Sequence, residues 1–356
     1  MALPKFAQVS QGFHSELKRR ISEYFASTNQ KPTGNFQLYL KATVLVTSYV
    51  ALYTHLVFFT PHIAIAVVEC VMLGMATAFI GFNIMHDGAH GSFSNSTIIN
   101  KLAAFSLNIL GGSHFMWNIK HNIIHHAYTN VDGVDDDIDA GILLRMAATQ
   151  PKRKFHKFQH VYFWVLYCIL YIYWIFVSDY RKYFRGKIGE MPLKKMSTKD
   201  HLTFWGYKLV HLGLFVGLPI FTWGIGAWAI GFVIFTTVAG FILSIVFQLA
   251  HTVEHTHFPM PDVVTGRIED EWAIHQVKTT ANFATSNRVV SWFVGGLNFQ
   301  VEHHLFPKIS HVHYPKINKI VKETCQKFGV EYIEYPSVGK AIKSHINYLK
   351  EMGRAA

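Results

Sequence analysis

Four groups of histidines in the sequence have the spacing of metal ligands. They are HDGAH (86–90), HNIIHH (121–126), HTVEH (251–255) and QVEHH (300–304). Each group contains two polar side chains four positions apart, which on a helix places them on one face, about 5–6 Å apart at Cβ. Each pair can therefore share one metal ion.

Two of the groups end in adjacent histidines, His125–His126 and His303–His304. Neighbouring residues on a helix point about 100° apart, so each doublet is expected to face two neighbouring ions. One zinc ion needs roughly three or four ligands, whereas these groups contain nine histidines. We therefore predict a site for two metal ions. Its candidate ligands are His86, His90, His121, His125, His126, His251, His255, Gln300, His303 and His304.

The ligand type alone does not identify the metal, because imidazole suits zinc, copper, iron and nickel. The soluble carboxylate di-iron bundles need an ExxH motif on each of two helices together with two further Glu. Here ExxH occurs only at Glu254–His257. The sequence therefore excludes that soluble fold.

Acidic side chains beside the candidate ligands are candidates for orienting the imidazole rings. Glu254 and Glu302 each stand next to a candidate ligand, and they either hydrogen-bond to a ring or lie in solvent as surface acids. Asp87 is a further candidate. The acidic loop 130–139 has no Glu at the twelfth position of a calcium loop. It is either a solvated turn or a source of ring partners such as Asp135.

Four apolar stretches must position these groups. Residues 38–59, 62–85, 204–222 and 226–250 are each near the ~20 residues that a membrane-spanning helix needs, and short connections join them into two hairpins. Only 15% of the residues are charged, against about 25% in an average soluble domain. The sequence thus predicts an all-α integral membrane protein with four transmembrane helices and a helical cap that carries a histidine-rich site for two metal ions.

The distribution of basic residues sets the orientation. No Lys or Arg occurs between residues 42 and 100, nor between 209 and 266. By the positive-inside rule both hairpin tips then face outward, and the termini and the central region are cytoplasmic. All four histidine groups therefore lie on one side of the membrane. The net charge of +11 suits a face against anionic headgroups and does not require a nucleic acid partner.

One further apolar stretch, 162–180, could pass for a fifth span. It is flanked by two strongly basic segments, PKRKFHK (151–157) and RKYFRGK (181–187), and it is rich in Tyr and Trp. A fifth crossing would place these flanks on opposite sides. We therefore expect a helix at about 160–180 that lies in the membrane interface.

Three of the groups, HDGAH, HNIIHH and QVEHH, resemble the histidine boxes of the membrane fatty acid desaturase family in order, spacing and position relative to two hairpins. The segments EWAIHQVKTTANFA (271–284) and GGLNFQVEHHLFP (295–307) are also similar to that family. A Gln at the first position of the third box, as at Gln300, is a feature in which the sequence resembles the front-end subgroup of that family. Members of that subgroup insert a double bond between an existing one and the carboxyl end.

The resemblance implies a chemistry. Two iron ions and O2 would introduce a cis double bond into a long-chain acyl group carried on CoA or on a lipid. The sequence contains no HPGG haem motif, so the expected electron donor is a separate ferredoxin or cytochrome b5-type protein with its reductase. The expected location is a bacterial plasma membrane.

The resemblance also assigns residues. His251 matches an additional ligand of the family, whereas His255 has the spacing to join it although a single histidine is common there in the subgroup. Gln276 and Asn298 match recurrent polar positions and are expected to support ligands. The histidines that match the three boxes are His86, His90, His121, His125, His126, His303 and His304.

The expected organisation is a cytoplasmic segment 1–37, a desaturase domain 38–320 and a cytoplasmic extension 321–356. The stretch 313–356 is expected to form short helices around an extended EYIEY. The three cysteines are far apart, and we interpret them as reduced apolar residues.

Other functions remain possible from the residues alone. A membrane hydroxylase, ketolase or alkane oxygenase would share the same boxes. A metal transporter would place its ligands near the bilayer midplane, and a membrane cytochrome would pair histidines within facing spans. The histidines here lie past the ends of the spans, which disfavours both of the latter.

Overall fold

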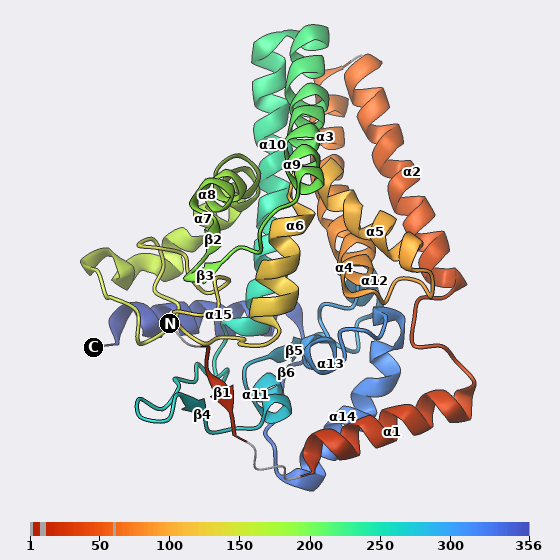
Figure 1. Cartoon of the computed structure of the whole chain (residues 1–356). Helices are drawn as coiled ribbons and strands as arrows, with labels where there is room; N and C mark the ends of the chain where they lie inside the picture. The colour runs from red at the N-terminus through yellow and green to blue at the C-terminus, as the bar shows by residue number, and fades with distance from the viewer. Residues whose placement is uncertain (1–2, 8–11, 60–61, 356) are drawn as a thin grey trace.

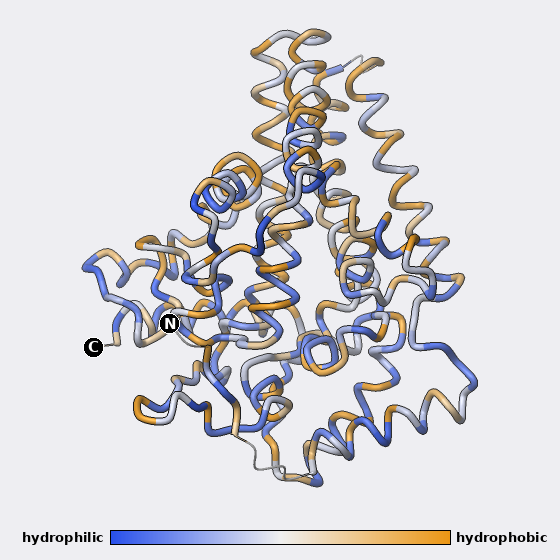
Figure 2. The backbone as a smooth tube through the Cα atoms, in the orientation of Figure 1, coloured by the Kyte–Doolittle hydropathy of each residue, from blue (hydrophilic) through white to orange (hydrophobic). Residues whose placement is uncertain are grey.

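The computed structural model describes residues 3–7, 12–59 and 62–355, and most of them are helical (Figure 1). Long helices run up one part of the molecule, and shorter helices and strands form a cap below them. Figure 2 shows hydrophobic residues along the long helices and more hydrophilic ones through the cap. This division is the predicted one between a membrane layer and a layer that carries the polar site.

The first two long helices are α2 (Phe36–Phe58) and α3 (Ile63–Ile80). Each begins with a side-chain cap: Asn35 Oδ1 accepts from the amide of Leu38, and His62 Nδ1 accepts from that of Ala64. Such caps satisfy amides that the first turn leaves without partners. Residues 60–61 of the predicted hairpin tip lie outside the described residues.

The second pair of long helices is α9 (Thr198–Leu212) and α10 (Leu218–His251), joined by a π-helical turn (Gly213–Gly217). The chain reverses inside the α10 range at Gly224, whose φ of 78° and ψ of 164° are not helical. A side chain would strain that backbone. The reversal confirms the hairpin that the sequence predicts at TWGIG.

A further long helical run is α7 (Gln159–Tyr173), a π-helical turn (Trp174–Ser178) and α8 (Asp179–Arg185). A Cβ on Gly240 of α10 would lie 2.7 Å from the Cys168 carbonyl oxygen of α7, so the two backbones are in close contact. By length and composition this run is one of four in the described residues that could cross a membrane; the others are Phe36–Phe58, Ile63–His90 and Thr198–His251. In Figure 1 it runs across the direction of the other long helices. Its expected position in the membrane interface stays a prediction.

Shorter helices complete the chain. They are α1 (Phe13–Thr28), α4 (His86–His90), α5 (Thr97–Ile109), α6 (His114–Trp117), α11 (Trp272–Lys278), α12 (Arg288–Phe293), α13 (Gln300–Leu305), α14 (Tyr314–Phe328) and α15 (Val338–Arg354). Four of them, α1, α11, α13 and α14, enclose an apolar core that includes Phe13, Val277, Val301 and Val321. That core fixes α11 and α13, which carry part of the site.

The strands are short and pair in twos. The parallel pair β1 (Lys5–Phe6) and β4 (Arg267–Ile268) and the antiparallel pair β2 (Lys187–Ile188) and β3 (Met191–Pro192) lie in loops. The parallel pair β5 (Ala281–Phe283) and β6 (Ile333–Tyr335) ties the C-terminal stretch to the cap. β6 falls within EYIEY, and helices flank it as expected. Helix α14 runs through the boundary that we predicted at residue 320.

Candidate metal centre

The first histidine group continues directly from a long helix. A π-helical turn (Gly81–Met85) joins α3 to α4, which contains His86 and His90. Since the helix is unbroken there, the two rings lie on one face with centroids 4.7 Å apart. Gly91, with a φ of 74°, ends the helix immediately afterwards.

The second group lies on a π-helical turn (Asn118–His125) that follows α6. The amide of His126 donates to the His121 carbonyl at 3.1 Å, which is a five-residue hydrogen bond. This wider turn brings both residues of the doublet near His121: its ring centroid is 5.2 Å from that of His125 and 4.8 Å from that of His126. Single π-helical turns often occur at functional sites.

The remaining histidines come from two helix ends. His251 is the last residue of α10, and His303 and His304 belong to α13. The ligand atoms fall into three groups, each within 4.8 Å: His86, His90, His121 and His303; His125, His251 and His304; and His126, His303 and His304. We call the first the front group, the second the rear group and the third the bridging group. The two residues of each doublet differ in their groups: His125 is in the rear group and His126 in the bridging group, whereas His303 is in the front group and His304 in the rear group.

The unpaired atoms of the cluster suit a metal. The Nε2 atoms of His90, His125 and His304 are buried without a hydrogen-bond partner, as are His303 Nε2 and both ring nitrogens of His251. His86 Nε2 lies only 3.2 Å from His121 Nε2. A buried polar atom without a partner costs about 1–3 kcal/mol, and a cation would satisfy several of these lone pairs together. The donor set therefore fits a metal centre.

Burial favours the neutral form of several of these imidazoles. It lowers the pKa of His126, His303 and His304 well below the usual range, and the neighbouring histidines lower each pKa further. A metal needs the neutral form, because the lone pair must be free. For His125 burial acts in the same direction, but Asp135 and Asp137 outweigh it and raise the pKa.

Polar side chains lie within hydrogen-bond distance of the Nδ1 atoms of several of these imidazole rings. Two of them were predicted: Asp135 Oδ2 lies 3.0 Å from His125 Nδ1, and Gln276 Oε1 lies 2.9 Å from His304 Nδ1. Tyr314 was not predicted; its hydroxyl lies 3.1 Å from His303 Nδ1. Such contacts leave Nε2 as the metal-facing atom.

Gln300 begins α13 and is almost fully buried. Its Oε1 has no hydrogen-bond partner, and it stands four residues before His304 on the same helix. An unpaired amide oxygen in this position is available to a cation or to a water molecule.

His255 is not brought to the other histidines. Helix α10 ends at His251, and His255 is exposed with a φ of 74°. In a continued helix the amide of His255 would donate to the His251 carbonyl. That carbonyl instead accepts from Asn130 Nδ2 and from Thr256 Oγ1, both at 2.9 Å. The four-residue spacing therefore does not apply here.

Four predicted supporting residues contact other partners. Glu302 is fully buried and accepts from Asn282, Asn318 and Tyr332, so it neither orients a ring nor lies in solvent. Burial raises its pKa. The carboxylate of Glu254 accepts from Asn347. The amide of Asn298 donates to the Ala284 carbonyl and to Ser291. Asp87 Oδ2 accepts from Ser310 Oγ and lies 2.9 Å from His311 Nδ1.

Sequence reasoning missed Asp137. A ligand atom of this residue lies within 4.8 Å of ligand atoms of His121 and His125. Asp137 also forms an ion pair with Lys120 at 2.7 Å. The run of aspartates at 135–137 is the signal in the sequence, although it does not say which one reaches the histidines.

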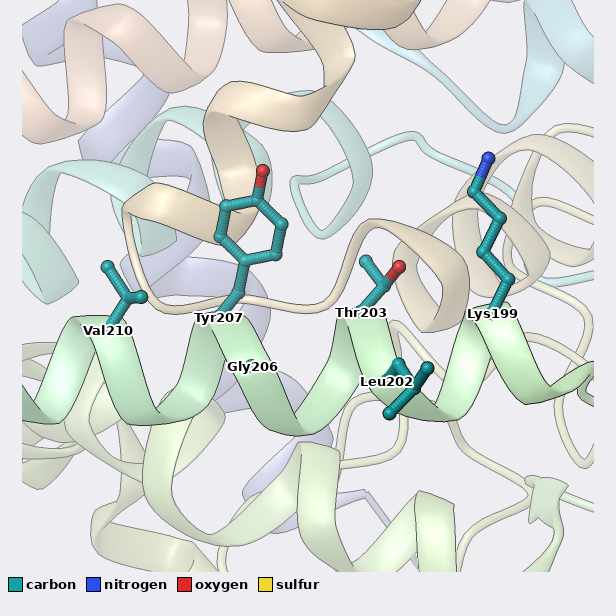
Figure 3. A pocket seen from close by; sticks show the side chains of 6 residues that line it. All are labelled: Lys199, Leu202, Thr203, Gly206, Tyr207 and Val210. Carbon is teal, nitrogen blue, oxygen red and sulfur yellow. The ribbon is translucent and has the colours of Figure 1, made fainter.

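A shallow groove of about 470 Å³ lies along one face of α9 and contains none of these histidines. Figure 3 shows its lining, which runs from Lys199 through Leu202, Thr203 and Tyr207 to Val210. Because Leu202 is 70% exposed, the groove belongs to the outer surface of the hairpin.

Long apolar helices and eight clustered histidines in the described residues define a membrane protein with a histidine cluster that is compatible with a metal site. The family model described as "Fatty acid desaturase" matches residues 60–336. The chain belongs to the fatty acid desaturase family and is thus an oxidoreductase that acts on fatty acyl groups.

Several relatives align over nearly the whole chain. The sn-1 linoleoyl-lipid 6-desaturase of Synechocystis sp. is 36% identical over 99% of this chain and 98% of that protein. The sn-1 linoleoyl-lipid 6-desaturase of Arthrospira platensis is 35% identical over 96% and 92%. An acyl-lipid (8-3)-desaturase of Physcomitrium patens is 35% identical over 97% of this chain and 72% of that protein.

Proposed function

We propose that this desaturase introduces a cis double bond into a long-chain acyl group of a membrane lipid, between an existing double bond and the carboxyl end. The convergence of eight histidines in three adjoining groups carries the proposal. The names of the relatives support the lipid-linked substrate and the position of the new bond. The Gln at position 300 supports the same subgroup.

The proposed cofactor is a pair of iron ions with O2 as co-substrate. The front group (His86, His90, His121 and His303) would hold one ion, and the rear group (His125, His251 and His304) would hold the other. His126 lies between them, and the unpaired oxygen of Gln300 is a further candidate. Iron and O2 would supply the oxidising power that removes hydrogen from unactivated methylenes, which acid–base side chains lack.

The chain itself supplies geometry and a dry environment. His251 and His304 are completely buried, so water is kept away from that part of the centre. Asp135 and Gln276 fix two of the rings from behind. These contacts orient the Nε2 atoms in the absence of a metal, and this lowers the free-energy cost of ordering the ligands when a metal binds.

The electrons are proposed to come from a separate ferredoxin or cytochrome b5-type protein with its reductase. The candidate ligands follow the ends of α3 and α10. Together with the basic residues of the termini, this supports a cytoplasmic cap with both termini cytoplasmic. The proposed location is a bacterial plasma membrane.

The test is expression in a host that lacks polyunsaturated lipids but has a working electron donor. Supplied C18 acyl chains should gain a double bond, which gas chromatography with double-bond location detects and places. His303→Ala should abolish the product, whereas the exposed His255→Ala should not. An unchanged fatty acid profile, or full activity in His303→Ala, would overturn the proposal. A hydroxylated product would instead identify the hydroxylase alternative.

A further inference from the structure

One buried amide joins three separate segments near the rear group. Asn130 is fully buried, and its Nδ2 donates to the carbonyl oxygens of His251 at 2.9 Å, His257 at 3.2 Å and Thr279 at 3.2 Å. The two hydrogens of the amide are thus shared among three acceptors. These acceptors lie at the end of α10, in the loop after it and at the end of α11.

Asn130 is linked to each member of the rear group, either directly or through intermediate residues. The backbone amide of Asn130 donates at 2.9 Å to Asp135 Oδ2, the same oxygen that lies 3.0 Å from His125 Nδ1. The carbonyl of His251 is itself an acceptor of Asn130. Thr279 directly follows α11, whose Gln276 holds His304.

The front group shows a different pattern. Its side-chain contacts outside the histidines include Tyr314 against His303 and the stacked ring of Trp117 against His121. Among the hydrogen bonds of the described residues, none joins Asn130 to a front-group residue. Through these bonds Asn130 is therefore linked to the rear group and, by way of their shared member His304, to the bridging group, but not to the front group.

The backbone explains why asparagine suits this position. Asn130 has a φ of 59°, in the left-handed region. Asparagine and aspartate tolerate that region better than most residues, and glycine adopts it freely. Of the three, only asparagine also provides a side-chain amide donor.

We propose that Asn130 is a positioning residue for the rear group: it sets the relative placement of His125, His251 and His304 without touching a metal itself. The inference rests on the proposed metal centre. It adds a selectivity that the family assignment does not contain, because the front group should not depend on this amide. Partners behind a ligand typically change metal affinity by about 10–100-fold when they are removed.

Two variants distinguish the contribution of the Asn130 side-chain amide from that of its left-handed backbone conformation. Asn130→Gly keeps the left-handed conformation and the backbone bond to Asp135 but removes the three side-chain hydrogen bonds. Asn130→Asp keeps the shape but loses the two amide hydrogens. The matched control is Asn29→Gly, because Asn29 is also left-handed, with a φ of 49°, but is exposed at the end of α1. All three should retain the far-ultraviolet circular dichroism of the wild type.

The measurement is a Co2+ titration of the purified protein in lipid nanodiscs, followed through the ligand-field spectrum, with bound metal counted by elemental analysis. We expect two ions in the wild type and in Asn29→Gly. In both Asn130 variants one ion should bind about 10–100-fold more weakly with an altered spectrum, and the other should be unchanged.

The outcomes are distinguishable. Unchanged metal affinity at both sites in Asn130→Gly would overturn the inference. Equal weakening of both sites, or loss of the fold in both variants, would also overturn it, because Asn130 would then have no selective effect on the rear group. A wild type that binds no metal would instead refute the proposed metal centre.

Discussion

The front and rear groups of the centre are built in different ways. The front group takes His86 and His90 from an unbroken helical extension of α3. The rear group takes His251 and His304 from the end of α10 and from the short helix α13, and polar side chains hold it from behind. A continuous helix places its side chains by itself, whereas helix ends need partners from distant parts of the chain.

The supporting contacts follow this difference. In the rear group Asp135 and Gln276 lie within hydrogen-bond distance of two rings, and Asn130 and Thr256 hold the carbonyl of His251. In the front group, Tyr314 lies beside His303. We infer that the rear group is more sensitive to changes outside the ligands themselves.

The largest effect should come from His303, because it belongs to both the front and the bridging groups. His303→Ala should reduce metal binding at both positions, whereas His90→Ala, which removes a member of the front group only, should leave the rear ion in place. Elemental analysis of the purified variants measures this. A His90→Ala protein that loses both ions would show that the two groups are not separable.

The helical part of this arrangement could be predicted from the sequence. The HDGAH spacing works because the helix continues from α3 through His90. The same spacing at HTVEH fails, because Asn130 and Thr256 take the carbonyl that a further helical turn would need. Asn130 is 121 positions away in the sequence and Thr256 lies in the following turn, so no local pattern reveals them.

Two other features also depended on tertiary structure. The π-helical turn over HNIIHH brings His125 and His126 to one neighbour, and the local sequence does not distinguish it from an α-helix. Glu302 could be placed beside a ligand, but its partners Asn282 and Tyr332 come from β5 and from the chain just before β6. The sequence could thus identify the candidate ligands more reliably than their supports.

An intermediate effect should distinguish the supports of the two groups. Gln276→Leu removes the oxygen 2.9 Å from His304 Nδ1 and should weaken the rear site by about 10–100-fold. Tyr314→Phe removes the hydroxyl beside His303 and should weaken the front site by less than about tenfold, because the helical placement of His86 and His90 remains. Co2+ titration of both variants measures the affinities. A larger loss in Tyr314→Phe would reverse the proposed order of sensitivity.

The smallest effect should be a pH dependence of protein stability that arises from His345 on the C-terminal helix α15. His345 on α15 is buried, with Nε2 2.8 Å from Tyr167 Oη and Nδ1 2.6 Å from the carbonyl of Thr252, the residue after His251. Burial lowers the pKa of His345 from the ordinary 6.5 to about 4, although the Thr252 carbonyl opposes this shift.

Because the folded pKa is the lower one, the unfolded chain binds the proton more readily. The stabilising effect of the neutral ring is therefore complete above about pH 6.5 and is lost as the pH falls towards 4. At about pH 5.5 this loss amounts to roughly 1 kcal/mol, which corresponds to about 1–2 °C in melting temperature for a chain of this length. His345→Gln keeps polar atoms for both contacts but does not titrate. Between about pH 7.5 and 5.5 the melting temperature of His345→Gln should therefore fall by a smaller amount than that of the wild type, and the difference should equal the shift given above. The exposed His255→Gln variant is the control and should behave as the wild type. An acid-induced fall of equal size in His345→Gln would show that α15 does not link pH to the stability of the region behind the rear group.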